Sequence, residues 1–329
     1  MNGVLRWSTW WVTLASACLA CGGEETLSGI DRPFRVRSAQ FEAENIPGLP
    51  PLSVEELQAG VAPTPPNVTS FSLNASLVPG TPNVALQGRA TTDVTAVALA
   101  LPDAGPGYWV VPVGPPDPSF EGEYAWSANF DIGHSLAPGL HELVMAGIDG
   151  AGHSGTQATT RLCVASPIPD NLNACAPKRK PPETVISLSW DAPVDLDLQV
   201  LTPGGKWVDA KHPTDAALDS TGKIGNSSRV TGVLQEDGGA GCLGRGRLSE
   251  HLVFSERPPA GVYSLHANLY SACTQASVRF ELSIWSAAEG EEPGTFRQKK
   301  TYSVVGIQLA SQANQGTQRG QFLTELVVE

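Results

Sequence analysis

The chain has 329 residues, which is long for one ordinary domain and suggests two. Its net charge of −12 repels phosphate backbones and anionic lipid, so nucleic acid is excluded as a first partner. Because 41% of the residues are apolar and only 16% are charged, the chain can build real cores and is no disordered acidic tail. Its 34 glycines and 27 prolines predict many turns.

The N-terminus is typical of a secretory signal peptide, which we expect over residues 1–20. A single positive charge at Arg6 precedes an apolar run that ends in small residues. The run is shorter than the ~20 apolar residues that span a bilayer, and no stop-transfer pattern follows it.

The signal ends in Cys18-Leu-Ala-Cys21-Gly-Gly-Glu-Glu, which resembles the lipobox of bacterial lipoproteins, where a cysteine is lipidated after cleavage. Cys18 has the better small residues before it. Cleavage before Cys21 leaves four further cysteines, an even number suited to disulfides in an oxidising compartment. We therefore expect lipid on Cys21, with Cys18 as the alternative and an unlipidated signal also open. The resemblance implies an envelope protein that its acyl chains hold to a membrane, the outer membrane being favoured, on the periplasmic or surface face.

Residues 21–67 are rich in proline and show no sustained apolar period, so we expect a tether there. One piece within it, Phe34 to Phe41, alternates and is a candidate for an added strand.

Residues 68–164 carry short apolar runs that turn residues separate, a pattern that predicts an immunoglobulin-like β-sandwich. In one run, Val97, Leu99 and Leu101 alternate with alanines, which sets one face inward. The segment Pro138 to Gly155 resembles the last hairpin of bacterial Ig-like surface modules. The seven expected strands are 71–73, 84–86, 94–101, 108–113, 124–130, 140–148 and 158–163.

Residues 165–182 form the predicted linker, in which Lys178 to Lys180 are expected to be solvated. Cys163 and Cys175 enclose a loop rich in Pro and Asn that is suited to a local disulfide. Residues 183–329 then predict a second all-β domain, where Cys242 is expected to pair with Cys273.

In this second domain two early strands show their inward face by alternation. Ile186, Leu188 and Trp190 share one face of the first. Leu196, Leu198 and Val200 share one face of the second. Further strands are expected around Trp207, at 253–254, 261–270 and 278–285, and at 296–305 and 322–328.

The segment from Leu188 to Gly205, LSWDAPVDLDLQVLTPGG, resembles the opening of the YfaP-like secreted β domain. Later parts follow in order, at Leu234 to Asp237, around Glu250, and at Pro259 to Tyr263. The chain departs from the family in the insertion Gly238 to Gly246, which holds Cys242. The resemblance implies an extracytoplasmic sandwich of jelly-roll type and no reaction.

The alternation of Leu196, Leu198 and Val200 places Asp195 and Asp197 on the outward face, ~6.5 to 7 Å apart along the strand. Like charges at this spacing favour a bridging cation, and Ca²⁺ takes six to eight oxygen ligands. The alternative is that both carboxylates are solvated or paired with Arg. Ca²⁺ is the only cofactor that the sequence suggests, and its other candidate oxygen donors are Asp191, Glu236, Asp237 and Glu250.

The two segments that partly match enzyme motifs are both incomplete. His141-Glu-Leu-Val-Met145 lacks the second His of a zinc protease, and Gly152-His-Ser-Gly155 is too short for a nucleophile elbow. We therefore expect a non-enzymatic envelope module that binds or scaffolds a protein or glycan partner. The alternative is a carbohydrate-active hydrolase, or its substrate-binding subunit, with Asp195 and Asp197 as the acid and base. A cleft that gathers Asp195, Asp197 and Glu250 at one point would favour that alternative.

Overall fold

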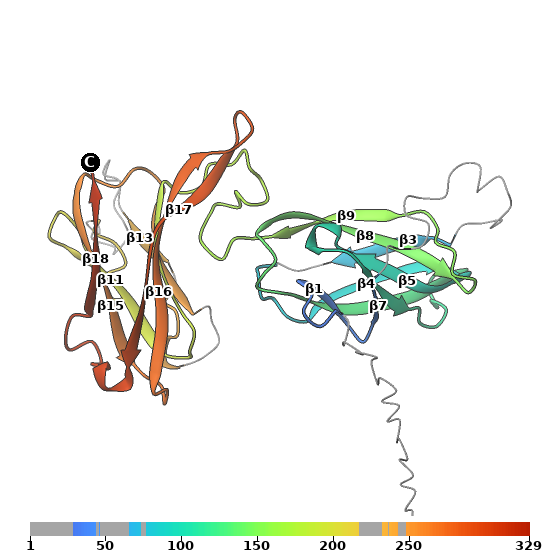
Figure 1. Cartoon of the computed structure of the whole chain (residues 1–329), viewed down its shortest axis with the longest axis horizontal. Coiled ribbons are helices and arrows are strands. Elements are labelled where there is room, and N and C mark those ends of the chain that lie inside the picture. The colour runs from blue at the N-terminus through green and yellow to red at the C-terminus, as the bar shows by residue number, and fades with distance from the viewer. Residues whose placement is uncertain are drawn as a thin grey trace, which may run out of the picture.

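The structure is a computed structural model that describes residues 29–43, 46, 66–73, 77–216, 232–235, 237–242 and 248–329. These residues form two antiparallel β-sandwiches, seen in Figure 1 as separate bodies with a linker loop between them. The predicted signal peptide and both candidate lipidation sites, Cys18 and Cys21, lie outside the described residues. Within those residues, no helix has the length and apolar character needed to cross a membrane.

The first sandwich is built from two sheets that share one core, to which Phe130 and Leu86 contribute from one sheet and Leu99 and Leu143 from the other. All seven strands expected in 68–164 are present, most of them longer than predicted. Sheet A has the order β1 (Phe34–Arg37), β7 (Glu123–Ile132), β4 (Val84–Thr91) and β3 (Val68–Leu73). Sheet B has the order β2 (Gln40–Glu42), β6 (Tyr108–Pro112), β5 (Val94–Ala100), β8 (Gly139–Asp149) and β9 (Ala158–Val164).

Not all of the segment predicted as a tether, 21–67, is a tether, because residues 34–42 belong to the first sandwich. Strand β1 pairs with β7, and β2 pairs with β6. Phe34 and Val36 are almost fully buried, and Phe34 contacts Phe130 with ring centroids 5.2 Å apart. The alternating piece at Phe34 to Phe41 is therefore an integral edge of both sheets.

Strand β5 is buried on both faces, whereas the alternation in the sequence set only one face inward. Val97 and Leu99 lie in the main core as expected. Ala98 and Ala100 lie in a second small cluster beneath Ile46 and Tyr108. The small alanine side chains leave room for that second layer, which the period of two does not reveal.

The second sandwich also has two sheets. Sheet C has the order β13 (Val233–Gln235), β14 (Ser249–Phe254), β10 (Thr184–Trp190), β16 (Ser277–Glu289) and β17 (Phe296–Leu309). Sheet D has the order β12 (Trp207–Val208), β11 (Asp195–Leu201), β15 (Gly261–Ser271) and β18 (Gln321–Val328). The inward faces predicted for β10 and β11 are confirmed, since Ile186, Leu188, Leu196, Leu198 and Val200 are all fully buried in the shared core.

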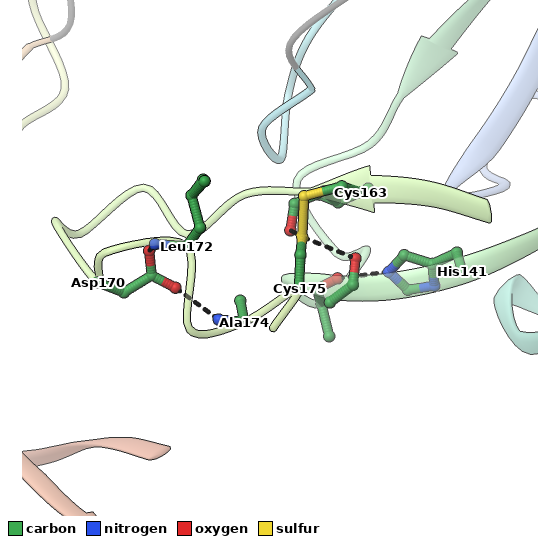
Figure 2. The surroundings of a disulfide bond; sticks show 9 residues. His141, Cys163, Asp170, Leu172, Ala174 and Cys175 are labelled. Carbon is green, nitrogen blue, oxygen red and sulfur yellow. Dashed lines mark hydrogen bonds between the residues drawn. A yellow bond between two sulfur atoms is a disulfide. The ribbon is translucent and has the colours of Figure 1, made fainter. Parts of the chain in front are cut away.

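Both predicted disulfides are confirmed. Cys163 is bonded to Cys175, which ties the end of β9 to the linker loop (Figure 2). In that loop the Asp170 carboxylate accepts hydrogen bonds from the backbone N–H groups of Leu172 and Ala174. Cys242 is bonded to Cys273 in the second sandwich.

Candidate metal centre

Strand β11 supplies the two central acidic side chains of the candidate site. Its core-facing residues, Leu196 and Leu198, are fully buried between the sheets. Asp195 and Asp197 alternate with them and therefore stand on the outer face of sheet D.

Around these two aspartates that outer face is covered, so their carboxylates do not lie on an open surface of the sheet. Asp195 is 6% exposed and Asp197 is 8% exposed. Asn268 of β15, next to Asp197 across the sheet, is fully buried, and its Oδ1 accepts a hydrogen bond from Asn314 Nδ2. Alternation identifies which face of a strand a residue occupies, but the segments that cover the face come from distant parts of the chain.

A third carboxylate comes from the turn that follows β13. Asp195, Asp197 and Asp237 each offer one oxygen such that the three atoms lie within 4.8 Å of one another. Asp237 is exposed, whereas the other two are buried. The structure therefore brings together three of the six candidate donors that the sequence offers.

None of the three aspartates is neutralised by a basic side chain within salt-bridge distance, as far as the described residues go. Instead, neutral donors bind two of them. Gly241 N donates to Asp195 Oδ2 at 3.0 Å, and Asn268 Nδ2 donates to Asp197 Oδ2 at 3.0 Å. Gly241 has a φ of 61°, a left-handed conformation that suits glycine. Among the described residues, no Arg pairs with Asp195 or Asp197 as that alternative requires.

Glu250 lies beside this group, on the inner side of the sandwich. It is fully buried in β14, and its Oε2 accepts a hydrogen bond of 2.7 Å from the N–H of Leu198, the residue after Asp197. Its Oε1 is buried and has no hydrogen-bond partner among the described residues. A buried carboxylate oxygen without a partner is costly, and a bound proton or cation relieves that cost.

The electrostatics of the site oppose full ionisation. Burial raises the pKa of Asp197 to about 6, Asn268 opposes this shift, and the charge of Asp195 adds to it. Burial and the charge of Asp237 also raise the pKa of Asp195, although the Gly241 hydrogen bond lowers it. Burial places the pKa of Glu250 well above its ordinary value, and the three aspartate charges add to that effect. A divalent cation would relieve the repulsion that all four carboxyl groups share.

Two of the other candidate donors are not part of the described site. Asp191 is exposed at the end of β10, in sheet C, and its Oδ1 accepts a hydrogen bond of 3.0 Å from Arg279 N. The prediction that Asp191 joins the cluster is wrong, because its carboxylate serves to pair the ends of β10 and β16. Glu236 lies outside the described residues.

The aspartates open into a pocket of about 640 Å³ on the outer face of sheet D, which we call the acidic pocket. Sequence reasoning missed Asp209 and Arg319, whose side chains form an ion pair with Nη1 and Oδ2 3.2 Å apart. Burial favours a higher pKa for Asp209, but hydrogen bonds from His212 and Arg319 outweigh it and lower that pKa. The residues that line the pocket include Asp195, Asp197, Gln199, Asp209, Asp237 and Arg319.

The acidic pocket leaves a cation accessible to ligands. Ca²⁺ takes six to eight oxygens, and three aspartates supply six at most. One oxygen of Asp195 and one of Asp197 already accept hydrogen bonds from the protein. A Ca²⁺ ion held here would therefore complete its coordination with water or with oxygens of a ligand in the pocket.

A disulfide holds one wall of the site in place. Cys242 directly follows Gly241, whose N–H donates to Asp195, and Cys242 is bonded to Cys273 beyond the end of β15. The segment that carries Asp237 and Gly241 is thereby fixed to sheet D.

No protein-family model matches the chain, and no curated protein matches it. Among solved structures, it is similar to dimeric latent PorU from Porphyromonas gingivalis, with 12% identity over 75% of this chain and 20% of that chain, at a TM-score of 0.24. It is also similar to the C-terminal domain of the Streptococcus agalactiae AgI/II polypeptide BspA, with 9% identity over 73% of this chain and 99% of that chain, at a TM-score of 0.19. The chain thus spans about a fifth of PorU, and TM-scores this low carry no argument about fold or function.

Proposed function

We propose that this protein is a non-enzymatic binding and scaffolding module of the bacterial cell envelope, whose second sandwich holds Ca²⁺. A lipid on Cys21 would anchor it, with the outer membrane as the favoured location. The observation that carries the calcium proposal is the meeting of Asp195, Asp197 and Asp237 close to Glu250, whose buried Oε1 has no hydrogen-bond partner among the described residues.

The proposal follows from the charge balance of the site. Two buried carboxylates and one exposed carboxylate crowd together without a basic partner among the described residues. Oxygen donors of this kind suit Ca²⁺ better than softer transition metals, which favour nitrogen and sulfur ligands. Binding to the folded state alone stabilises it by mass action.

The alternative is a carbohydrate-active hydrolase, and one observation favours it. Asp197, with a pKa raised to about 6, has the property of a general acid, and Asp195 lies next to it in a pocket. The cleft proposed to gather Asp195, Asp197 and Glu250 is only partly formed, because Glu250 is fully buried and does not line the pocket. The binding module remains the better-supported proposal.

A thermal scan of the lipid-free mature chain tests the calcium site. At a hundredfold excess of Ca²⁺ over its dissociation constant, we expect a gain of ~2.7 kcal/mol over the sample in chelator. Replacing Asp195 and Asp197 together by Asn should abolish this response, because the cluster then keeps a single carboxylate. Glu291→Gln is the control, since Glu291 is exposed in the turn between β16 and β17. Identical melting of the wild-type protein in millimolar Ca²⁺ and in chelator would refute the site.

A further inference from the structure

A row of aromatic rings lies on the same outer face of sheet D as the acidic pocket. The rings of Trp207 and His266 have centroids 5.1 Å apart, and those of His266 and Phe322 are 5.5 Å apart. The three residues come from β12, β15 and β18, so the row crosses the sheet. Phe322 is 54% exposed.

The strand register explains why these rings share one face. Trp207 pairs with Leu201, and His266 pairs with Phe322. Their chain neighbours Val208 and Leu265 point into the core and are almost fully buried. The alternation of each strand then leaves the rings outside.

Arg319 joins the aromatic row to the acidic pocket. Its guanidinium carbon lies 4.1 Å from the centroid of the Trp207 ring, and its Nη1 lies 3.2 Å from Asp209 Oδ2. Gly320 N donates to Gln199 Oε1, and a Cβ at Gly320 would lie 2.3 Å from Ala267 O, so only glycine fits there. The backbone that presents Arg319 is therefore held close against the sheet, and the Arg319 side chain contacts one residue of the pocket, Asp209, and one of the row, Trp207.

We infer that the acidic pocket and the aromatic row together bind an uncharged glycan, whose hydroxyl groups complete the coordination of Ca²⁺ in the pocket and whose ring faces pack on Phe322 and on the part of Trp207 that Arg319 does not cover. The inference rests on the proposed calcium site and names its ligand class.

Charge complementarity selects the occupant. Four aspartates line the pocket, and its fixed cations are Lys211 and Arg319. One Ca²⁺ ion balances the remaining two negative charges, so the loaded pocket has no net charge to attract an anionic ligand. A polyhydroxyl ligand supplies neutral oxygen donors for the open positions on the ion.

The aromatic row can contact the apolar C–H face of a sugar ring. The C–H groups on a sugar ring carry partial positive charge and pack on the negative face of an aromatic ring. Exposed apolar surface rimmed by polar groups is typical of a ligand site. The pocket of about 640 Å³ has room for a sugar unit, and the adjacent row extends the surface for a chain.

The experiment is calorimetric titration of the lipid-free mature chain with a panel of uncharged hexasaccharides, namely those of cellulose, xylan, mannan, starch and chitin. We expect at least one to bind in Ca²⁺ and not in chelator. Trp207→Ala and Phe322→Ala should each weaken that binding by about 10-fold to 30-fold, because the loss of an anchoring ring removes an interface hot spot. Phe322 is more than half exposed, so its replacement leaves the core intact.

Trp285→Ala is the matched control. Trp285 also has a stacked cation, Lys300 Nζ at 5.1 Å from the ring centroid, but it belongs to β16 in sheet C. Its replacement should leave glycan binding unchanged. Equal loss in the Trp285 and Trp207 variants would overturn the inference, as would binding that persists in chelator.

Two further outcomes separate this inference from the calcium proposal. If Ca²⁺ raises the melting temperature but no hexasaccharide binds, the glycan inference fails and the calcium site stands. If polygalacturonate, an anionic glycan, binds in place of the neutral sugars, the assignment to uncharged glycans fails. If Ca²⁺ has no thermal effect, both proposals fail together.

Discussion

Replacing Asp197 by Asn should stabilise the metal-free protein at neutral pH. Burial raises the pKa of Asp197 from 3.8 to about 6, so the folded state holds this proton more tightly than the unfolded chain does. Stability then falls as the pH rises between 3.8 and about 6, because the unfolded chain releases the proton first. Above that window the cost of ionising the buried group is fully present.

The size of the effect follows from the same pKa values. The difference between 3.8 and about 6 corresponds to roughly 3 kcal/mol at neutral pH, which is the ceiling for the gain. Asn has nearly the shape of Asp, and its Oδ1 can still accept the hydrogen bond that Asn268 Nδ2 donates at 3.0 Å. Its new amide N–H group can donate to the neighbouring carboxylates of Asp195 and Asp237, so no new unpaired donor is expected.

Asp209 provides a control from the same pocket with the opposite sign. Burial alone would raise its pKa, but the hydrogen bonds from His212 and Arg319 outweigh burial and lower it. The ionised form of Asp209 therefore stabilises the fold above the pKa of the unfolded chain. Asp209→Asn should lower stability at neutral pH, whereas Asp197→Asn should raise it.

The assay is thermal unfolding of both variants and the wild-type protein in chelator, at neutral pH and at about pH 4. Hydrogen exchange of the β11 and β15 amides identifies the transition that belongs to the second sandwich. The advantage of Asp197→Asn should shrink at the lower pH, where wild-type Asp197 is protonated. The reasoning is refuted if both variants destabilise the protein at neutral pH, or if the gain is independent of pH.

Three shorter predictions address other parts of the molecule. Removing the Cys242 to Cys273 disulfide, which spans 31 residues, should cost about 4 kcal/mol by the chain-entropy estimate and weaken Ca²⁺ binding, as thermal scans with and without Ca²⁺ can measure. Gly306→Ala should destabilise by about 1–3 kcal/mol in denaturant unfolding, because its Cβ would lie 2.2 Å from Phe280 Cζ. Intact-mass analysis of the N-terminal peptide should find acyl chains on Cys21. A lipidated peptide that starts at Cys18 would contradict this.

The strands of both sandwiches were predictable because each encodes its inner face locally. Leu196, Leu198 and Val200 alternate within five positions, and all three are fully buried. The same alternation placed Asp195 and Asp197 together on the other face. The local pattern therefore predicted two of the residues of the site, Asp195 and Asp197.

The cover over that site was not predictable, because it depends on contacts between distant positions. Asp209 and Arg319 are 110 residues apart, and no local motif at either residue predicts their ion pair. Gln199 accepts from Gly320 N across 121 residues. The prediction that Asp191 joins the cluster failed for a related reason. Asp191 lies close to Asp195 in sequence, but the chain passes from sheet C to sheet D between the two residues.

The linker offers a last prediction, because its loop is tied to both sandwiches. The Cys163 to Cys175 disulfide holds the loop to the end of β9. On the other side, Asn173 Nδ2 donates to Phe296 O at 2.9 Å and to Arg179 O at 2.7 Å, and Phe296 N donates to Pro177 O at 2.7 Å. Asn173 is 5% exposed, so it works as a buried clamp between the loop and the start of β17.

Asn173→Ala should leave those two carbonyl groups without their donor and loosen the loop on the second sandwich, where the bonds from Phe296 N to Pro177 O and from Gln298 Nε2 to Pro169 O remain. The expected cost of about 1–3 kcal/mol is local, so the melting of each sandwich should change little while protease cleavage in the linker becomes faster. Asn171→Ala is the matched control, since Asn171 Nδ2 donates only within the loop, to Lys180 O at 3.1 Å. Equal cleavage of the two variants would mean that Asn173 does not help to join the linker to β17, and that the disulfide and the remaining hydrogen bonds fix the loop.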